Sequence, residues 1–543
     1  MKKIYKKISV ILCLACAGVF VFAQSIELPE VTTVISGETE KAEADALPDF
    51  SDVLEKPGIA ASGSGGVEPV LPEVEISENT EIAAGKNLPA DKSVYAEGLL
   101  GGGYPAFFKG DIAVFRNTGD SPFRFSLSHD SAAGYSGHSL TEGFNDRSTK
   151  IEIEKSYKKN NLSLSAQGGY KAQADGLQGN VSSYVKDEYP GSLFNRDFYN
   201  AKGQVSYEFS NGFYTGFDAG LDFYTRYADK KCNIIPTLAY LDFEPAAYIK
   251  WKGHGFDTGI TAAYSFGKEM TDMDFANGHR AEFMADLQWQ NDFVRLFGKA
   301  SAVVGNHLND KPVIVPFTIG IDSSFPVYFA NRRVAISAEG GIKSYKPHIW
   351  QLENNFKFAE INFNTSETSD WYGRFNLTLP LKSLFTGTAT IEYYQTAYDN
   401  GVFEADYSED ISSIYYILPE KHQLLTTDFT LSYAYDIFSI SGAWHSNWMD
   451  IPSLESKQSV RLALNFQDQK VRWGTSLDFL MMINSEIETP VVNAEGFVRI
   501  TPSVRAILSL NDIIKMYKGE TRSYAGKYAA RGGSATVLLK FFF

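Results

Sequence analysis

The chain has 543 residues, of which 44% are hydrophobic and 14% aromatic, and it carries a formal net charge of −15. This acidic balance argues against nucleic-acid binding, because a nucleic-acid-binding protein needs a basic face. A soluble chain of this length would divide into several domains, yet no segments with helical periodicity are present to build them.

The first 23 residues have the pattern of an export signal. Lysines crowd the first seven residues, residues 8–22 are apolar, and small side chains precede Gln24. The apolar run is too short to cross a bilayer comfortably as a helix. We therefore predict a signal peptide cleaved after Ala23, and disfavour both a membrane anchor and a lipoprotein acylated at Cys16. Cleavage leaves Cys232 alone, which excludes an internal disulfide.

Residues 24–91 differ in composition from the rest of the chain. They contain 15 acidic residues, three lysines and one aromatic residue. Such a segment cannot bury enough apolar surface to offset its chain entropy, so we predict a mostly disordered periplasmic arm. The sequence Leu-Pro-Glu-Val occurs at 28–31 and again at 71–74. The arm is therefore either a solvated spacer or a docking segment for a periplasmic partner that binds by strand addition.

From residue 92 onward, apolar and polar residues alternate with a period of two. Residues 371–379 show it clearly, because Trp371, Phe375 and Leu377 share one face and Arg374 and Asn376 share the other. These segments run about 10–12 residues, the length that a tilted strand needs to cross a bilayer. Aromatic residues near segment ends match the girdles at membrane interfaces. We predict an all-β fold over residues 92–543, a large antiparallel transmembrane barrel in contact with outer-membrane lipid of a diderm bacterium.

The candidate strands give the size of this barrel. They lie near residues 92–101, 104–115, 121–130, 147–157, 161–171, 199–209, 212–224, 240–251, 255–266, 280–290, 293–304, 311–321, 332–342, 370–380, 385–395, 424–435, 437–446, 456–466, 470–480, 491–501, 503–510 and 533–543. The number is about 22, and even numbers from 20 to 24 fit the rule for bacterial barrels. The short connections at 291–292 and 435–437 should face the periplasm, and the longer ones at 131–146, 172–198 and 399–422 should face outward.

The final strand ends in an alternating aromatic pattern. Counting back from the last residue, every second residue is apolar: Phe543, Phe541, Leu539 and Val537. A terminal aromatic residue on such a strand resembles the signal that the barrel-assembly machinery reads. We therefore predict that these four residues direct insertion.

Charges of both signs fall on the face that should line the lumen. The principal candidates are Arg333, Arg374, Arg461, Arg499, Glu282, Asp286, Glu339 and Glu392. Further candidates are Arg124, Arg472, Lys540, Glu152, Glu154, Asp218, Asp222, Asp478 and Glu495. They indicate either a hydrated lattice of ion pairs or a ladder of charges that orients a dipolar solute.

The count of strands and both ends of the barrel resemble TonB-dependent outer-membrane receptors. The segments that resemble this family are 95–104, 508–512 and 524–533, together with the final strand. Members of that family have a folded plug ahead of the barrel, whereas this chain has only the acidic arm. The resemblance therefore implies a plug-less, transporter-like or porin-like barrel, in which energy-coupled uptake is in doubt.

No catalytic, metal-binding or cofactor-binding constellation is evident. His445, Ser446 and Asn447 have the residue types of an outer-membrane phospholipase, but adjacent strand residues point to opposite faces. Acidic residues at 269–274 and 406–410 lack the order of a calcium loop. We expect a barrel that is not an enzyme, with a structural or surface-adhesion barrel as the alternative. Its lumen should be occupied by inward loops, by the arm or by a separate partner.

Overall fold

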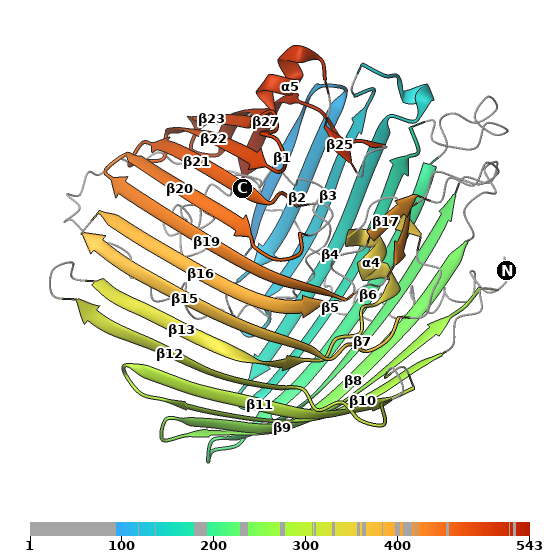
Figure 1. The fold of residues 1–543 in the computed structure, drawn as a ribbon, viewed down its shortest axis with the longest axis vertical. Helices are drawn as coiled ribbons and strands as arrows, with labels where there is room; N and C mark the ends of the chain where they lie inside the picture. The colour runs from blue at the N-terminus through green and yellow to red at the C-terminus, as the bar shows by residue number, and fades with distance from the viewer. Residues whose placement is uncertain are drawn as a thin grey trace. The chain divides into compact units, whose positions relative to one another are not determined.

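The computed structural model describes residues 94–543, apart from 118, 136, 179–192, 229–236, 272–276, 307, 309–310, 328–331, 356–358, 361–364, 383, 397–401, 406–414, 419–420, 452–454, 521 and 525–527. The predicted signal peptide with Ala23 and the predicted arm lie outside these residues, as does Cys232. Within them, 22 strands form one antiparallel sheet that closes on itself (Figure 1). The predicted barrel and its strand number are confirmed.

The barrel strands are long and follow one another around the ring in chain order. They are β1 (Tyr95–Tyr104), β2 (Phe107–Arg116), β3 (Phe123–Ala133), β4 (Asn145–Lys159), β5 (Leu162–Gly176), β6 (Leu193–Glu208), β7 (Phe213–Ala228), β8 (Leu238–Gly253), β9 (Phe256–Glu269), β10 (Gly278–Gln290), β11 (Val294–Gly305), β12 (Phe317–Val327), β13 (Arg332–Lys343), β15 (Asp370–Lys382), β16 (Phe385–Thr396), β19 (His422–Tyr435), β20 (Phe438–Asn447), β21 (Gln458–Gln467), β22 (Trp473–Ile483), β23 (Val491–Thr501), β24 (Val504–Asn511) and β27 (Ser534–Phe542).

Short elements occupy the connections between barrel strands. They are η2 (Leu140–Glu142), α4 (Ile349–Asn355), β14 (Ala359–Glu360), β17 (Val402–Ala405), β18 (Tyr415–Leu418), α5 (Ile513–Lys518), β25 (Ser523–Tyr524) and β26 (Tyr528–Ala529). Among the described residues, no helix is both long and apolar enough to span a bilayer.

The two ends of the barrel differ in their connections. At the end where β1 begins and β27 finishes, many strands are joined by tight turns, and we call it the turn end. Asn160, His254 and Asp436 have positive φ there, as two-residue hairpin turns require. The opposite end, which we call the loop end, carries the long connections, including 344–369 and 512–533. The strand ends that flank the predicted short connections lie at the turn end, and those that flank the predicted long connections lie at the loop end.

Strands β5 and β6 extend further into the loop end than the sequence predicted. Residues 172–176 and 193–198 continue their ladder. Two contacts between the strands support this extension: Tyr170 donates a hydrogen bond to Asp197 at 3.1 Å, and Arg196 forms an ion pair with Asp175.

One face of each strand is apolar and exposed, and it forms the outer surface of the barrel. Ile260, Phe283 and Ile319 are 61–67% exposed and lie on three nearby strands. Trp251 and Trp289 face outward near the turn end, where an interfacial girdle places aromatic side chains. The opposite face, with the next residue along each strand, lines the lumen.

The first and last strands meet at a glycine-rich seam. Gly101 pairs with Leu538 and Gly103 with Thr536. A Cβ atom on Gly101 would lie 2.1 Å from the carbonyl oxygen of Val537, so only glycine allows this close approach. On β27 itself, Val537 and Leu539 face outward with the terminal Phe543, all exposed.

Candidate functional site

In the connection between β13 and β15, the described residues 344–355 and 365–369 fold into the lumen and lie on the inner wall. We call residues 344–369 the lumen segment; Figure 1 shows its helix α4 in front of the strands near β5 and β6. Ile349 and Leu352, one helical turn apart, are buried on the same face of α4. The side chain of Gln351 accepts a hydrogen bond from the backbone N–H of His348 at 3.1 Å, which satisfies one donor at the start of the helix.

A buried carboxylate fastens the helix to the wall. Glu353 is completely buried and forms an ion pair with Arg226 of β7, which is also completely buried. Tyr224 donates a hydrogen bond to the other oxygen of Glu353 at 2.6 Å. Arg196 of β6 donates to the backbone carbonyl of Glu353 at 2.6 Å and pairs with Asp175 of β5. Buried charges persist only when they are paired and hydrogen-bonded, and this cluster meets that requirement.

The lumen segment is also held ahead of the helix. His348 places Nδ1 3.0 Å from a carboxylate oxygen of Asp242 and Nε2 3.1 Å from one of Glu244, both on β8. Burial alone would lower the pKa of His348, but hydrogen bonds and the negative charges of Asp242 and Glu244 raise it to about 10. The imidazole is therefore a cation at neutral pH and bridges two wall carboxylates.

A third contact fixes the far end of the lumen segment. Glu367 is buried and lies 3.0 Å from the guanidinium of Arg280 on β10. Its carboxylate also accepts a hydrogen bond from Ser344, near the start of the segment. Arg280 also forms an ion pair at 2.8 Å with Glu282, which is one of the predicted lining residues. The segment thus contacts the wall from β5 to β10.

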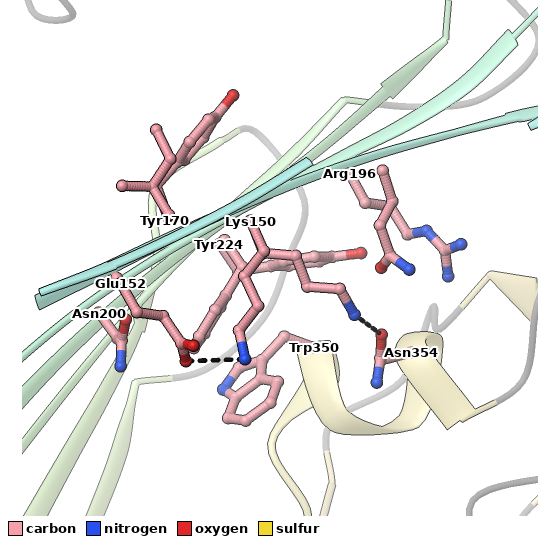
Figure 2. Close-up of a pocket in the computed structure, with 13 residues that line it drawn as sticks. Lys150, Glu152, Tyr170, Arg196, Asn200, Tyr224, Trp350 and Asn354 are labelled. Carbon is pink, nitrogen blue, oxygen red and sulfur yellow. Dashed lines mark hydrogen bonds and ion pairs between the residues drawn. The ribbon is translucent and has the colours of Figure 1, made fainter. Parts of the chain in front are cut away.

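A cavity of about 250 Å³ lies between α4 and the wall strands β4 to β7. Figure 2 shows Lys150, Trp350 and Asn354 on one side of the strands, and Tyr170 on the other. Lys150 pairs with Glu152 at 2.7 Å, and the ammonium of Lys171 donates a hydrogen bond to Asn354 at 3.2 Å. Cations and aromatic rings therefore meet at one hollow inside the barrel.

A second connection also packs onto inner-wall residues near the loop end. Arg531, which precedes β27, pairs with Asp130 at 2.5 Å and with Asp146. Gln178 accepts a hydrogen bond from the backbone N–H of Ala529 at 2.7 Å and donates one to its carbonyl at 2.8 Å. Tyr528 is buried beside these contacts. The connection between β24 and β27 is thereby tied to β3, to β4 and to the residues that follow β5.

The eight principal lining residues all occupy inward-facing positions of the wall. Register places Glu282 opposite Val303, Asp286 opposite Lys299, Arg333 opposite Pro326, Glu339 opposite Arg374, Arg374 opposite Glu392, Arg461 opposite Ala443 and Arg499 opposite Arg505. Arg374 forms an ion pair with Glu392 at 2.8 Å, and Arg461 with Asp478 at 2.5 Å. Their contacts are between neighbouring strands. Whether any of them selects a solute stays a prediction.

One predicted lining residue is misplaced. Arg472 lies in the turn between β21 and β22 and is exposed, with its guanidinium 2.8 Å from Asp468 of the same turn. Val471, immediately before it, has a positive φ of 52°, which ends the strand geometry. The turn therefore takes Arg472 out of the wall.

The sequence interpretation missed the lumen segment and its partners Arg226, Arg196, Asp242 and Glu244. Glu353 stands in a seven-residue helix, too short to show clear amphipathic periodicity. The only available signal was the unusual length of the 344–369 connection, since long connections in compact domains are often functional.

Comparison with known proteins gives matches only at the level of structure. No protein-family model matches the chain, and no curated protein does. The copper transporter OprC has a TM-score of 0.60 at 11% identity, over 83% of this chain and 80% of that one. The FrpB iron transporter from Neisseria meningitidis (F5-1 variant) scores 0.60 at 9% identity, covering 85% and 83%. The siderophore receptor PirA from Pseudomonas aeruginosa scores 0.59 at 9% identity, covering 84% and 81%.

These likenesses show the fold. The resemblance to the barrels of TonB-dependent receptors, first drawn from the strand count and the ends of the sequence, is confirmed at that level. Whether the chain lacks a plug stays a prediction, because the residues ahead of the barrel lie outside those that the structure describes.

Proposed function

We propose that the protein is a transport barrel of the bacterial outer membrane whose passage is narrowed by the lumen segment. Its solute is unidentified. The exposed apolar face of the strands suits contact with lipid hydrocarbon. The three similar structures are named as two metal transporters and a siderophore receptor, which supports passage or capture of a solute over catalysis.

The observation that carries this proposal is the buried pair of Glu353 and Arg226. A connection that served only as a surface loop would have no need of a carboxylate fully buried against the inner wall. Removing one partner of such a pair leaves an uncompensated buried charge, so the pair favours the docked position strongly. The lumen segment is therefore a fixed constriction that can be released by a single substitution.

Planar-bilayer conductance of the refolded full chain tests this role. Glu353→Gln should raise the conductance, because the segment loses its anchor and leaves the wall. Asp322→Asn is the matched control, since it breaks a half-exposed pair with Arg295 that joins two neighbouring wall strands. Equal conductance in the wild type and Glu353→Gln would show that the segment does not limit passage. A mature chain that is soluble in the periplasm would overturn the outer-membrane assignment itself.

The last strand is proposed to carry the signal for the barrel-assembly machinery. Phe541 and Phe543 stack outward with ring centroids 6.3 Å apart, whereas Phe542 lies over Arg505 and Lys540 on the other face. Replacing both outward residues with Ser should leave the protein unassembled, while Phe542→Ser should still insert. Surface levels in cells report the outcome. Normal levels of the double variant would refute this assignment, in which Val537 and Leu539 contribute to the same outward pattern.

The arm of residues 24–91 is proposed to act on the periplasmic side, which we assign to the turn end. It either enters the lumen partially or docks a periplasmic partner through its two Leu-Pro-Glu-Val sequences. Deleting residues 24–91 separates these roles. Changed conductance favours entry into the lumen, and unchanged conductance favours docking. The competing function, surface adhesion through the loop end, is favoured if neither the deletion nor Glu353→Gln changes passage.

A further inference from the structure

The cavity beneath α4 collects positive charge that the surrounding residues do not fully balance. Lys150 and Lys171 stand directly opposite each other on β4 and β5. Arg196 lines the same cavity. Like charges opposite each other on neighbouring strands destabilise a sheet. A fold that retains two lysines in this register thus keeps an unfavourable arrangement at one place on its inner wall.

Counterions are present for two of the three cations. Lys150 has Glu152, and Arg196 has Asp175. The Lys171 ammonium instead contacts the neutral side-chain amide of Asn354, and within the described part of the chain no carboxylate lies within ion-pair distance of it. An anion that entered the cavity would meet this ammonium and relieve its repulsion with Lys150.

The rest of the cavity offers flat apolar surfaces. The rings of Phe198 and Trp350 lie 4.5 Å apart between their centroids, and Tyr224 also lines the hollow. Small-molecule sites typically combine apolar and aromatic walls with a few convergent polar groups. The volume of about 250 Å³ lies slightly below the usual range of such sites, so the bound molecule is small.

We propose that this cavity binds a small organic anion, a carboxylate or phosphate joined to a flat apolar body. The charged group meets Lys171 and Lys150, and the flat body lies against Trp350 and Phe198. The inference deepens the proposed function, because a solute bound here would lie on the route past the lumen segment. Wall and helix both contribute to the cavity, so binding also requires the docked position of α4.

Isothermal titration of the full chain, folded in detergent, tests the proposal. The probes are benzoate and phenyl phosphate, with benzyl alcohol and benzylammonium as neutral and cationic counterparts. At least one aromatic anion should bind, and the better of the two identifies the charged group. Lys171→Gln should weaken this binding about tenfold, since a hydrogen bond to a charged group contributes at least that factor. Lys299→Gln, which removes an inward lysine on β11, should leave it unchanged.

Folding of each variant is checked by heat-modifiable gel mobility, and Lys150→Gln replaces Lys171→Gln if the latter does not fold. Binding of benzyl alcohol as tight as that of benzoate would overturn the proposal. So would absence of binding by both anions, or equal binding by Lys171→Gln and the wild type. A barrel that conducts but binds no aromatic anion removes this inference alone. A chain that binds the anion but neither inserts nor conducts removes the proposed function alone.

Discussion

The inner wall has two regions that share the same alternation of polar and apolar residues. They differ in how far their charged side chains are buried. From β5 to β10 the wall is covered by the lumen segment, and its charges, such as Arg226 and Asp242, are almost completely buried. At β15 and β16 the pair of Arg374 and Glu392 joins two neighbouring strands, and its side chains are 31% and 18% exposed. A partly exposed ion pair contributes little to stability, whereas removing one partner of a buried pair is strongly destabilising. Inward charge therefore marks a lumen wall, and from β5 to β10 the buried charges are those that contact the lumen segment.

Glu353→Ala should have the largest effect, because it should release the lumen segment from the covered region of the wall. Arg226 would remain buried without its counterion, at a cost of about 3–5 kcal/mol to the docked state. Hydrogen exchange of the backbone amides in 344–369 should become fast while the barrel strands stay protected. Glu392→Ala, in the exposed region, is the comparison and should leave protection of its neighbours nearly unchanged. Slow exchange of α4 in Glu353→Ala would mean that the ion pair does not hold the helix.

Arg531→Ala tests the second connection that packs onto the inner wall. It would leave Asp146, which is buried, without its guanidinium and should cost the local fold about 2–3 kcal/mol. Limited proteolysis should then cleave within 512–533 under conditions that leave the wild type intact. Arg531→Lys should recover part of the protection, because an ammonium replaces the charge but cannot bond two carboxylates in the same fork. Identical cleavage of all three proteins would contradict this role.

Alkaline pH should loosen the lumen segment at His348. Its pKa in the folded protein is about 10, above the usual 6.5, so its contribution is complete below pH 6.5 and is lost as the pH rises through 10. We expect a loss of about 1.5 kcal/mol, the scale of a hydrogen bond to a charged group. Asp242 and Glu244 face the ring directly, and Lys346 of the same segment and Asp222 of β7 lie nearby. Exchange rates of 344–369 between pH 6 and 10.5, after correction for intrinsic exchange, should rise in the wild type and stay flat in His348→Gln.

Arg374→Gln should have the smallest effect. The pair with Glu392 remains partly hydrated, so its loss should change the free energy of unfolding by less than about 1 kcal/mol. Urea unfolding of the single and double variants of this pair measures the coupling. A coupling as large as that between Glu353 and Arg226 would remove the distinction between the two regions of the wall.

The barrel was predictable from sequence because a period of two is local. The alternation of polar and apolar residues within a strand identifies its two faces without information from any other strand. Counting the segments that show this alternation gave 22 strands. Some boundaries were wrong for equally local reasons. The strand expected at 311–321 begins at Phe317, because Pro312 and Pro316 lack the N–H groups that a ladder needs. Before it, Ile314 forms an isolated bridge with Val303.

The candidate site could not be predicted in the same way. Glu353 finds Arg226 and Tyr224 on β7, far from it in the chain, and no periodic pattern connects them. The cavity likewise needs Lys150 and Lys171 from the wall together with Trp350 from the helix. Such a site exists only once the ring has formed and a connection has folded back across it.

The glycine-rich seam between β1 and β27 has a consequence for the order of folding. Every other neighbouring pair in the ring joins strands that follow one another in the chain, whereas this pair joins the two ends of the barrel sequence. Closing so distant a contact carries the largest loop entropy, so the seam should form last. Until then both strands present unpaired N–H and C=O groups, which are templates for aggregation. Gly101 and Gly103 allow the backbone of the last strand to pair closely with that of the first, because they have no side chains that would collide with it. The nascent sheet can then close quickly on itself before another chain adds to its edge.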